Sequence, residues 1–216
     1  PRLLSSSIYQ LNNFVDSIFG SMAVIVGEGG VAVLYFAYRL IQFPVGVFTN
    51  ALSQAILPTL STQALDADRA HLKKTLLFGL RATFFVMVPA SVAFMVLAHP
   101  IIEALFGGGR FDAYSAQATA RALFFYSFGL SAYGATRVVQ SCFFAIKDTV
   151  TPAKIAGMAL GMNVAFILIL IYPLKIGGIA LSSSLSGIIS FSILFSVLRK
   201  RLAPLPLRPL VLFCFK

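Results

Sequence analysis

The chain has 216 residues, of which 58% are hydrophobic and only 11% are charged. A soluble domain carries about 25% charged residues, so this much apolar surface cannot be hidden inside one soluble core. The composition predicts an all-α, polytopic integral membrane protein. It excludes a large water-soluble catalytic domain, a disordered chain, a coiled coil and a disulfide scaffold. At roughly 20 residues per membrane helix plus short loops, the length allows about six spans.

Six hydrophobic segments are predicted to cross the membrane. In chain order they are residues 5–26, 30–58, 73–98, 116–145, 152–172 and 177–198. Glycines and polar residues with turn-forming chemistry separate them. Segments 30–58 and 116–145 are longer than a bilayer requires, so we expect them to tilt, kink or continue past the interface. Pro44 and Pro89 each lack a backbone hydrogen-bond donor and are the candidate kinks.

The domain organisation follows from these segments. Residues 1–200 are predicted to form one lobe of membrane helices, and residues 201–216 a basic, proline-rich cytoplasmic tail. The first residue is Pro1 rather than Met, which suggests a piece of a longer protein. Cys142 and Cys214 lie in apolar surroundings, so we expect buried thiols without a disulfide.

The net charge of +10 comes from 17 basic and 7 acidic residues. In a soluble protein this excess would suggest nucleic acid as a partner. In a membrane protein the excess of basic residues indicates how the chain is oriented in the membrane, because cytoplasmic loops are enriched in Lys and Arg. Alternating the loops places two basic residues, Arg110 and Lys175, on one side. The other side receives eleven: Arg2, Arg69, Lys73, Lys74, Lys147, Lys154, Arg199, Lys200, Arg201, Arg208 and Lys216.

The side with eleven basic residues is predicted to be cytoplasmic, and both chain ends lie there. The loops on that side are 59–72, 146–151 and 199–216. The loops on the periplasmic side are 27–30, 99–115 and 173–177.

Two charged residues lie deep inside predicted spans. At 1.5 Å per residue, Asp16 is about 16 Å from the cytoplasmic end of its span and Arg39 is about 13 Å from the opposite end of the next. Both therefore fall near the middle of a hydrocarbon core about 30 Å thick. A charge there is costly and usually faces a cavity or a partner. The functional interpretation is an anion-binding Arg39 in a transport pathway, with Asp16 tuning it or binding a cation. The structural alternative is an ion pair between two helices.

Segment 30–58 carries a stripe of polar and small residues at steps of three or four: Tyr35, Arg39, Gln42, Gly46, Asn50 and Ser53. This spacing places them on one face of an α-helix. A helix facing lipid would not keep such a face, so we expect it to line water or another polar helix. A shorter series occurs in segment 116–145: Tyr126, Tyr133, Arg137 and Gln140. For Arg137, Arg81 and Arg121, snorkelling to an interface is an equal alternative to facing a cavity.

The last two predicted spans also contain polar residues. Asn163 is the strongly polar residue of segment 152–172. In segment 177–198, a small residue stands at every fourth position: Gly178, Ser182, Ser186 and Ser190. The structural interpretation of this series is close helix packing. The functional one is that Ser183 joins Asp16 and Asn163 around a small cation through oxygen ligands.

No catalytic constellation is present in the sequence, so we expect no enzyme. His71 and His99 have no Cys or acidic cluster at ligand spacing, which gives no basis for a metal site of that kind. The glycines at 107–109 lack the Lys-Ser/Thr of a phosphate-binding loop.

Seven strings, taken together, carry a family resemblance. They are Tyr9-Gln10-Leu11-Asn12, Val15-Asp16, Tyr35 to Leu40, Gln42 to Phe48, Leu57 to Ser61, Ala145 to Pro152 and Gly177 to Leu181. In this order and spacing they resemble the MurJ/MviN lipid II flippase family of the multidrug/oligosaccharidyl-lipid/polysaccharide exporter superfamily. The resemblance covers about residues 5–200. It implies the second of two six-helix lobes, with the first lobe of the same protein as its partner.

The resemblance implies a function in cell-wall synthesis. Lipid II would be translocated by alternating access from the cytoplasmic to the periplasmic leaflet of the bacterial inner membrane. The family's cavity arginine falls on Arg39, in agreement with its depth in the span. We expect the head group to contact Arg39, Tyr35, Gln42, Asn50 and Arg137, besides bilayer lipids around the lobe.

The family's sodium-binding positions fall on Asp16, Asn163 and Ser183, with a backbone contribution near Ile179. Na+ is therefore the implied coupling ion, and no other cofactor is expected. Two positions differ from the family pattern: Tyr38 stands where Asp or Asn is common, and Ile167 where a second polar residue is common. The alternatives are a polysaccharide-lipid flippase or drug exporter of the same superfamily, or a membrane scaffold of a cell-wall complex that transports nothing.

Overall fold

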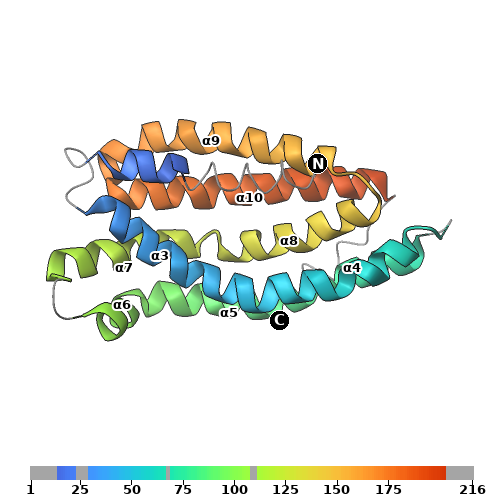
Figure 1. Ribbon diagram of the computed structural model, residues 1–216, viewed down its shortest axis with the longest axis horizontal. Coiled ribbons are helices and arrows are strands. Elements are labelled where there is room, and N and C mark those ends of the chain that lie inside the picture. The colour runs from blue at the N-terminus through green and yellow to red at the C-terminus, as the bar shows by residue number, and fades with distance from the viewer. Residues whose placement is uncertain (1–13, 23–28, 67–68, 108–110, 203–216) are drawn as a thin grey trace.

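A computed structural model describes residues 14–22, 29–66, 69–107 and 111–202. These ranges are almost entirely helical (Figure 1). Residues 14–20 form a short helical stretch. The elements that follow are α3 (Gly30–Pro44), the π-helical segment η1 (Val45–Asn50), α4 (Ala51–Gln63), α5 (Ala70–Val96), α6 (Ala98–Phe106), α7 (Ala113–Ser127), α8 (Leu130–Ala145), α9 (Val150–Leu174) and α10 (Ile176–Arg201).

Within the described ranges, four stretches are long and apolar enough to cross a membrane. They are Gly30–Gln63, Ala70–Val96, Val150–Leu174 and Ile176–Arg201. They confirm four of the six predicted spans, although the first runs past its predicted end at residue 58. Of the predicted span 5–26, residues 14–22 are described. The predicted tail lies outside the described residues from 203 onward, and so does Cys214.

The predicted span 116–145 is divided into two helices, which agrees with a kink, one of the outcomes expected from the length of this segment. Helix α7 ends at Ser127 and α8 begins at Leu130. The break has a cause in α10, because Ser184 Oγ donates to the carbonyls of Phe125 and Tyr126 at 2.8 and 3.2 Å. Gly129 permits that approach, since a Cβ on it would lie 2.9 Å from the backbone of Ser184.

Two predicted loops also contain helix. The cytoplasmic loop predicted at 59–72 is shortened because α4 continues to Gln63. The periplasmic loop predicted at 99–115 contains α6, whose last residue Phe106 packs its ring against Phe36 at 4.8 Å. Of the two candidate kinks, Pro44 immediately precedes the π-helical segment, whereas α5 runs unbroken through Pro89.

The helices lie side by side along the long axis of the molecule (Figure 1). Helices α9 and α10 pair as a hairpin, α7 and α8 run beside α10, and the long α3–η1–α4 helix lies with α5. The apolar core has two parts. One surrounds Tyr126 and includes residues of α3, α7 and α10. The other surrounds Phe143 and includes residues of α4, α5 and α8, with the buried thiol of Cys142.

Close packing accounts for Gly178, the first residue of the small-residue series in α10, whereas Ser186 and Ser190 of that series line a cavity. A Cβ on Gly178 would lie 2.2 Å from the carbonyl oxygen of Leu170, so α9 and α10 touch at this glycine. A Cβ on Gly187 would lie 2.5 Å from the ring of Tyr133 in α8. Larger residues at either position would separate the helices.

The turn between α8 and α9 is held by Asp148. Its carboxylate accepts hydrogen bonds from the backbone N–H groups of Val150 and Thr151 at 3.1 and 3.0 Å, and from the Thr151 hydroxyl at 2.6 Å. Arg201 at the end of α10 pairs with the same carboxylate. Partial burial favours the neutral acid, but the hydrogen bonds from Thr151 outweigh it and lower the pKa of Asp148.

Candidate functional site

Three polar residues distant in sequence meet at Asp16. The carboxylate lies between α9 and α10 and is 6% exposed. Asn163 of α9 donates its amide N–H to Asp16 Oδ1 at 3.0 Å, and Ser183 of α10 donates its hydroxyl to Oδ2 at 2.8 Å. Ser183 also lies 3.4 Å from Asn163 Oδ1. The convergence predicted from the depth of these residues in their spans is confirmed. Their role in binding a cation stays a prediction.

Tyrosines complete the surroundings of Asp16. The Tyr126 hydroxyl of α7 is 3.5 Å from Asp16 Oδ2, at the limit of a hydrogen bond. The ring of Tyr126 meets that of Tyr38 edge-on, with centroids 5.9 Å apart. Tyr38 in turn accepts a hydrogen bond from the Gln42 side chain at 2.5 Å. A chain of contacts therefore links the carboxylate to α3.

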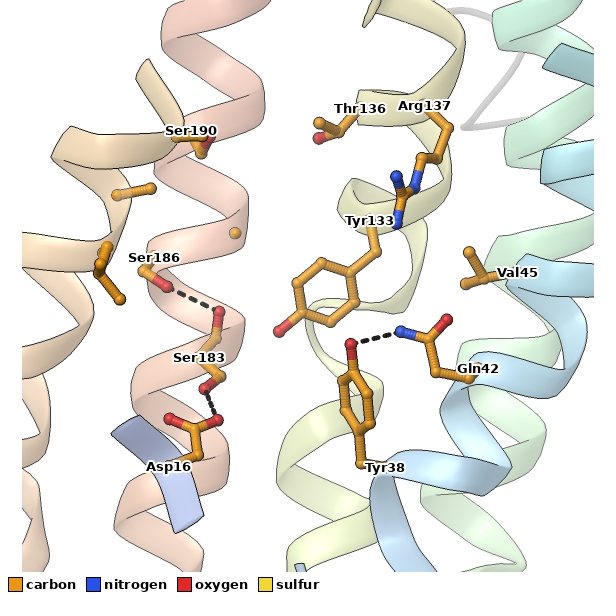
Figure 2. A pocket seen from close by; sticks show the side chains of 14 residues that line it. Asp16, Tyr38, Gln42, Val45, Tyr133, Thr136, Arg137, Ser183, Ser186 and Ser190 are labelled. Carbon is orange, nitrogen blue, oxygen red and sulfur yellow. Dashed lines mark hydrogen bonds between the residues drawn. The ribbon is translucent and has the colours of Figure 1, made fainter. Parts of the chain in front are cut away.

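Two cavities share Asp16, Tyr38 and Gln42 in their walls. The first is lined on its other sides by Arg137, Tyr133, Thr136, Ala156, Ala159, Leu160, Val45 and the α10 residues Ser183, Ser186, Gly187 and Ser190. Figure 2 shows Tyr38 and Gln42 on one wall of it and Asp16 with Ser183 on the opposite wall. The second is lined further by Ser17, Val31, Leu34, Tyr35, Arg39 and Tyr126.

Arg39 lies at the second cavity, on the exposed face of α3. Its guanidinium carbon is 4.9 Å from the centre of the Tyr35 ring, a cation–π contact between adjacent turns. Arg39 and Asp16 share this cavity, but within the described ranges no ion pair joins them. The ion-pair alternative left open by the sequence is therefore wrong.

The other predicted head-group contacts are divided between the cavities. Tyr35 shares the second cavity with Arg39, Gln42 lines both, and Arg137 lines the first. Asn50 is half-buried at the end of η1 and lines neither of these two cavities. The structure thus groups Tyr35, Arg39 and Gln42 and leaves Asn50 apart from them.

The oxygen atoms around Asp16 have the chemistry of a hard-cation site. Asp16 supplies two carboxylate oxygens, Asn163 an amide oxygen and Ser183 a hydroxyl oxygen, all of them ligand types that such ions prefer. In the arrangement seen here Asn163 and Ser183 donate hydrogen bonds to the carboxylate. Ile167 and Ile179 are fully buried, so their side chains contribute only apolar surface.

Sequence reasoning missed two residues of the site. Tyr126 was placed on a polar stripe but not connected to Asp16, and Tyr38 was noted only as a departure from the family pattern. Hydropathy does not separate a tyrosine that packs from one that donates a hydrogen bond. The usable signal was spacing, because Tyr38 stands four residues before Gln42, where side chains meet on a helix.

The family model described as "Lipid II flippase MurJ" matches residues 1–216. The chain belongs to the lipid II flippase MurJ family. Among curated members, a probable lipid II flippase MurJ of Buchnera aphidicola is 32% identical over 201 residues, which cover 93% of this chain and 39% of that protein. The lipid II flippase MurJ of Burkholderia cenocepacia is 31% identical, with 93% and 38% covered. The chain spans about two fifths of the length of these MurJ relatives.

Solved structures agree with this membership. One described as lipid II flippase MurJ in an inward closed conformation is 26% identical, with a TM-score of 0.82 over 98% of this chain and 43% of its own. A transporter of the MOP superfamily from Pyrococcus furiosus is 14% identical, with a TM-score of 0.72 over 94% of this chain and 43% of its own. The second shows the shared fold alone.

Proposed function

We propose that this lobe is part of a flippase that moves lipid II from the cytoplasmic to the periplasmic leaflet of a bacterial inner membrane. The observation that carries the proposal is Arg39, a guanidinium inside a membrane-length helix that faces a cavity and stacks on Tyr35 rather than pairing with an acid. An intramembrane charge kept in this way is expected to serve a substrate. Because the chain belongs to the MurJ family, we expect Arg39 to bind the pyrophosphate of lipid II.

The chemistry of this step is binding rather than catalysis. The guanidinium fork can hold two phosphate oxygens at once, which a lysine ammonium cannot do. Gln42 and Tyr35 line the same cavity and add polar contacts beside the phosphate. The remaining contacts with the head group would come from the other lobe of the protein. Relative rocking of the two lobes would then expose the site to each leaflet in turn.

Arg39→Ala is the direct test, made in the gene product as the cell makes it. Charge-assisted hydrogen bonds are worth about 1.5–3 kcal/mol, so losing them should weaken lipid II binding by roughly 10- to 100-fold and abolish translocation. Arg39→Lys should keep partial activity at most. Arg199→Ala, the same change at the exposed cytoplasmic end of α10, is the matched control and should translocate normally.

The readouts separate transport from folding. Protein abundance in the membrane should be the same for all three variants, because Arg39 makes no ion pair within the described ranges. Normal lipid II flipping by an Arg39→Ala protein at normal abundance would refute the proposal. The scaffold alternative predicts instead that the unaltered protein flips no lipid II.

Na+ as the coupling ion is a second part of the proposal, supported by the oxygen donors around Asp16. A ligand that binds only the folded state raises its stability, by about 2.7 kcal/mol at 100 times its Kd. Added Na+ should therefore raise the thermal midpoint, whereas choline of equal ionic strength should not. Asp16→Asn should abolish the difference between the two salts. Equal midpoints in both salts for the unaltered protein would contradict Na+ binding.

A further inference from the structure

The π-helical segment η1 lies in the middle of the helix that carries Arg39. It spans Val45–Asn50, directly after Pro44. π-Helical turns are rare inside α-helices and occur frequently at functional sites. Because a π turn holds about one extra residue, it rotates the helix that follows it by about 100° relative to a continuous α-helix. Helix α4 is therefore turned relative to α3.

This rotation breaks the polar stripe of the sequence. At α-helical spacing, Ser53 would lie on the same face as Tyr35 and Arg39. In the structure Tyr35 is 50% exposed, whereas Ser53 is 7% exposed and packed toward α8. The backbone carbonyl of Ser53 accepts a hydrogen bond from Ser141 of α8 at 3.3 Å. The predicted single face from 35 to 53 is therefore wrong for the arrangement seen here.

Three buried hydroxyls around this segment have no hydrogen-bond partner among the described residues. Within the part of the chain that the structure describes, Thr49 Oγ1, Ser53 Oγ and Thr83 Oγ1 are buried and have no partner. Other buried hydroxyls of this lobe behave differently, since those of Ser91, Thr119, Ser127 and Thr136 each donate to the carbonyl one turn earlier. Buried polar groups in native proteins are nearly always paired, so this cluster calls for a cause.

The surface against which η1 packs includes a glycine. Gly134 of α8 has no side chain, and a Cβ there would lie 3.1 Å from Thr49 Oγ1 and 3.0 Å from Thr83 Cγ2. Gly46 within η1 is exposed, and a Cβ on it would meet nothing within 4 Å. Thr49 therefore packs directly against the backbone of α8, while the segment is open at Gly46.

We propose that η1 is a rotary switch between two arrangements of the helix Gly30–Gln63. In the arrangement seen here the π turn places Thr49 and Ser53 against α5 and α8, where their hydroxyls have no hydrogen-bond partner in the described part of the chain. In the second, the π turn relaxes to α-helix and both hydroxyls join Arg39 on the open face. The sequence spacing is that of the second arrangement, and the unpaired hydroxyls disfavour the first. The switch does not depend on which lipid the protein moves.

Cysteine reactivity tests the second arrangement directly. Ser53→Cys is made in the complete gene product, with Cys142 and Cys214 replaced by Ala, and treated with a water-soluble maleimide in nanodiscs. Ala37→Cys, fully buried in α3, is the unreactive control, and Tyr35→Cys is the reactive one. A minor state populated at about 0.1–10% predicts a Ser53→Cys rate about 10- to 1000-fold below that of Tyr35→Cys. A rate equal to that of Ala37→Cys would overturn the proposal.

Deletion of Gly46 provides the matched locked form. Removing one residue lets η1 close as an α turn while α4 keeps its present packing, so the second arrangement is out of reach. The deletion should eliminate the reactivity of Ser53→Cys and stop transport without changing abundance. Normal transport by the deletion variant, or unchanged Ser53→Cys reactivity in it, would overturn the proposal. If the deletion variant does not accumulate, the rate measured in the undeleted chain decides.

Discussion

Removal of the Asp16 carboxylate should destabilise this lobe, because two buried donors would lose their acceptor. Asn163 is fully buried and Ser183 is 4% exposed, and they bond Asp16 at 3.0 and 2.8 Å. Side-chain hydrogen bonds between membrane helices average about 0.6 kcal/mol with a maximum near 1.7, and a buried donor left unpaired costs about 1–3 kcal/mol. For two bonds, Asp16→Ala should cost about 2–4 kcal/mol.

The variants of the network should follow a fixed order. Ser183→Ala removes one of the two strong bonds and should cost about half as much as Asp16→Ala. Tyr126→Phe removes only the 3.5 Å contact and should cost less than about 1 kcal/mol. In the double variant Asp16→Ala with Ser183→Ala, the stranded hydroxyl is gone. The loss should therefore be about 1 kcal/mol smaller than the sum of the two single variants.

The buried thiol of Cys142 provides the assay. A dye that fluoresces on reaction with thiols reports unfolding as Cys142 becomes exposed, once Cys214 is replaced by Ala. At about 2–4 °C per kcal/mol for a chain of this size, Asp16→Ala should lower the midpoint by roughly 5–15 °C. Equal midpoints for Asp16→Ala and Tyr126→Phe would refute the reasoning, because the carboxylate would then not hold the helices together.

Three further predictions concern other parts of the lobe. The pKa of Asp148 is lowered in the folded state, so the ionised carboxylate stabilises the fold. This stabilisation is complete above about pH 4, the ordinary Asp value, and is lost as the pH falls through the lower folded-state pKa. Asp148→Asn should remove this acid-dependent decrease in the thermal midpoint. Gly187→Ala should cost about 1–3 kcal/mol by pushing the tyrosine ring it faces, whereas Gly157→Ala, with open space around its Cβ, should stabilise α9 by up to about 1 kcal/mol. An impermeant thiol reagent added outside intact cells should label Leu105→Cys and not Leu65→Cys, and the reverse pattern would invert the predicted topology.

Local patterns in the sequence were enough to identify the fold class and four membrane-length helices. Hydropathy and turn chemistry act over neighbouring residues, so they need no knowledge of what packs against a helix. The depth of Asp16, Asn163 and Ser183 in their spans was also sufficient to predict that they meet. A buried polar group in an apolar span must find partners at its own depth, and few were available.

Contacts between helices decided what local patterns could not. The break after Ser127 depends on Ser184, a residue 57 positions later whose hydroxyl takes the carbonyls that would continue the helix. The links from Asp16 to Tyr126 and onward to Tyr38 depend on three elements coming together. The π turn after Pro44 rotates Ser53 away from the face that its spacing predicts. Periodicity describes one helix on its own, whereas the rotation of α4 appears only where it packs against α5 and α8 in the folded lobe.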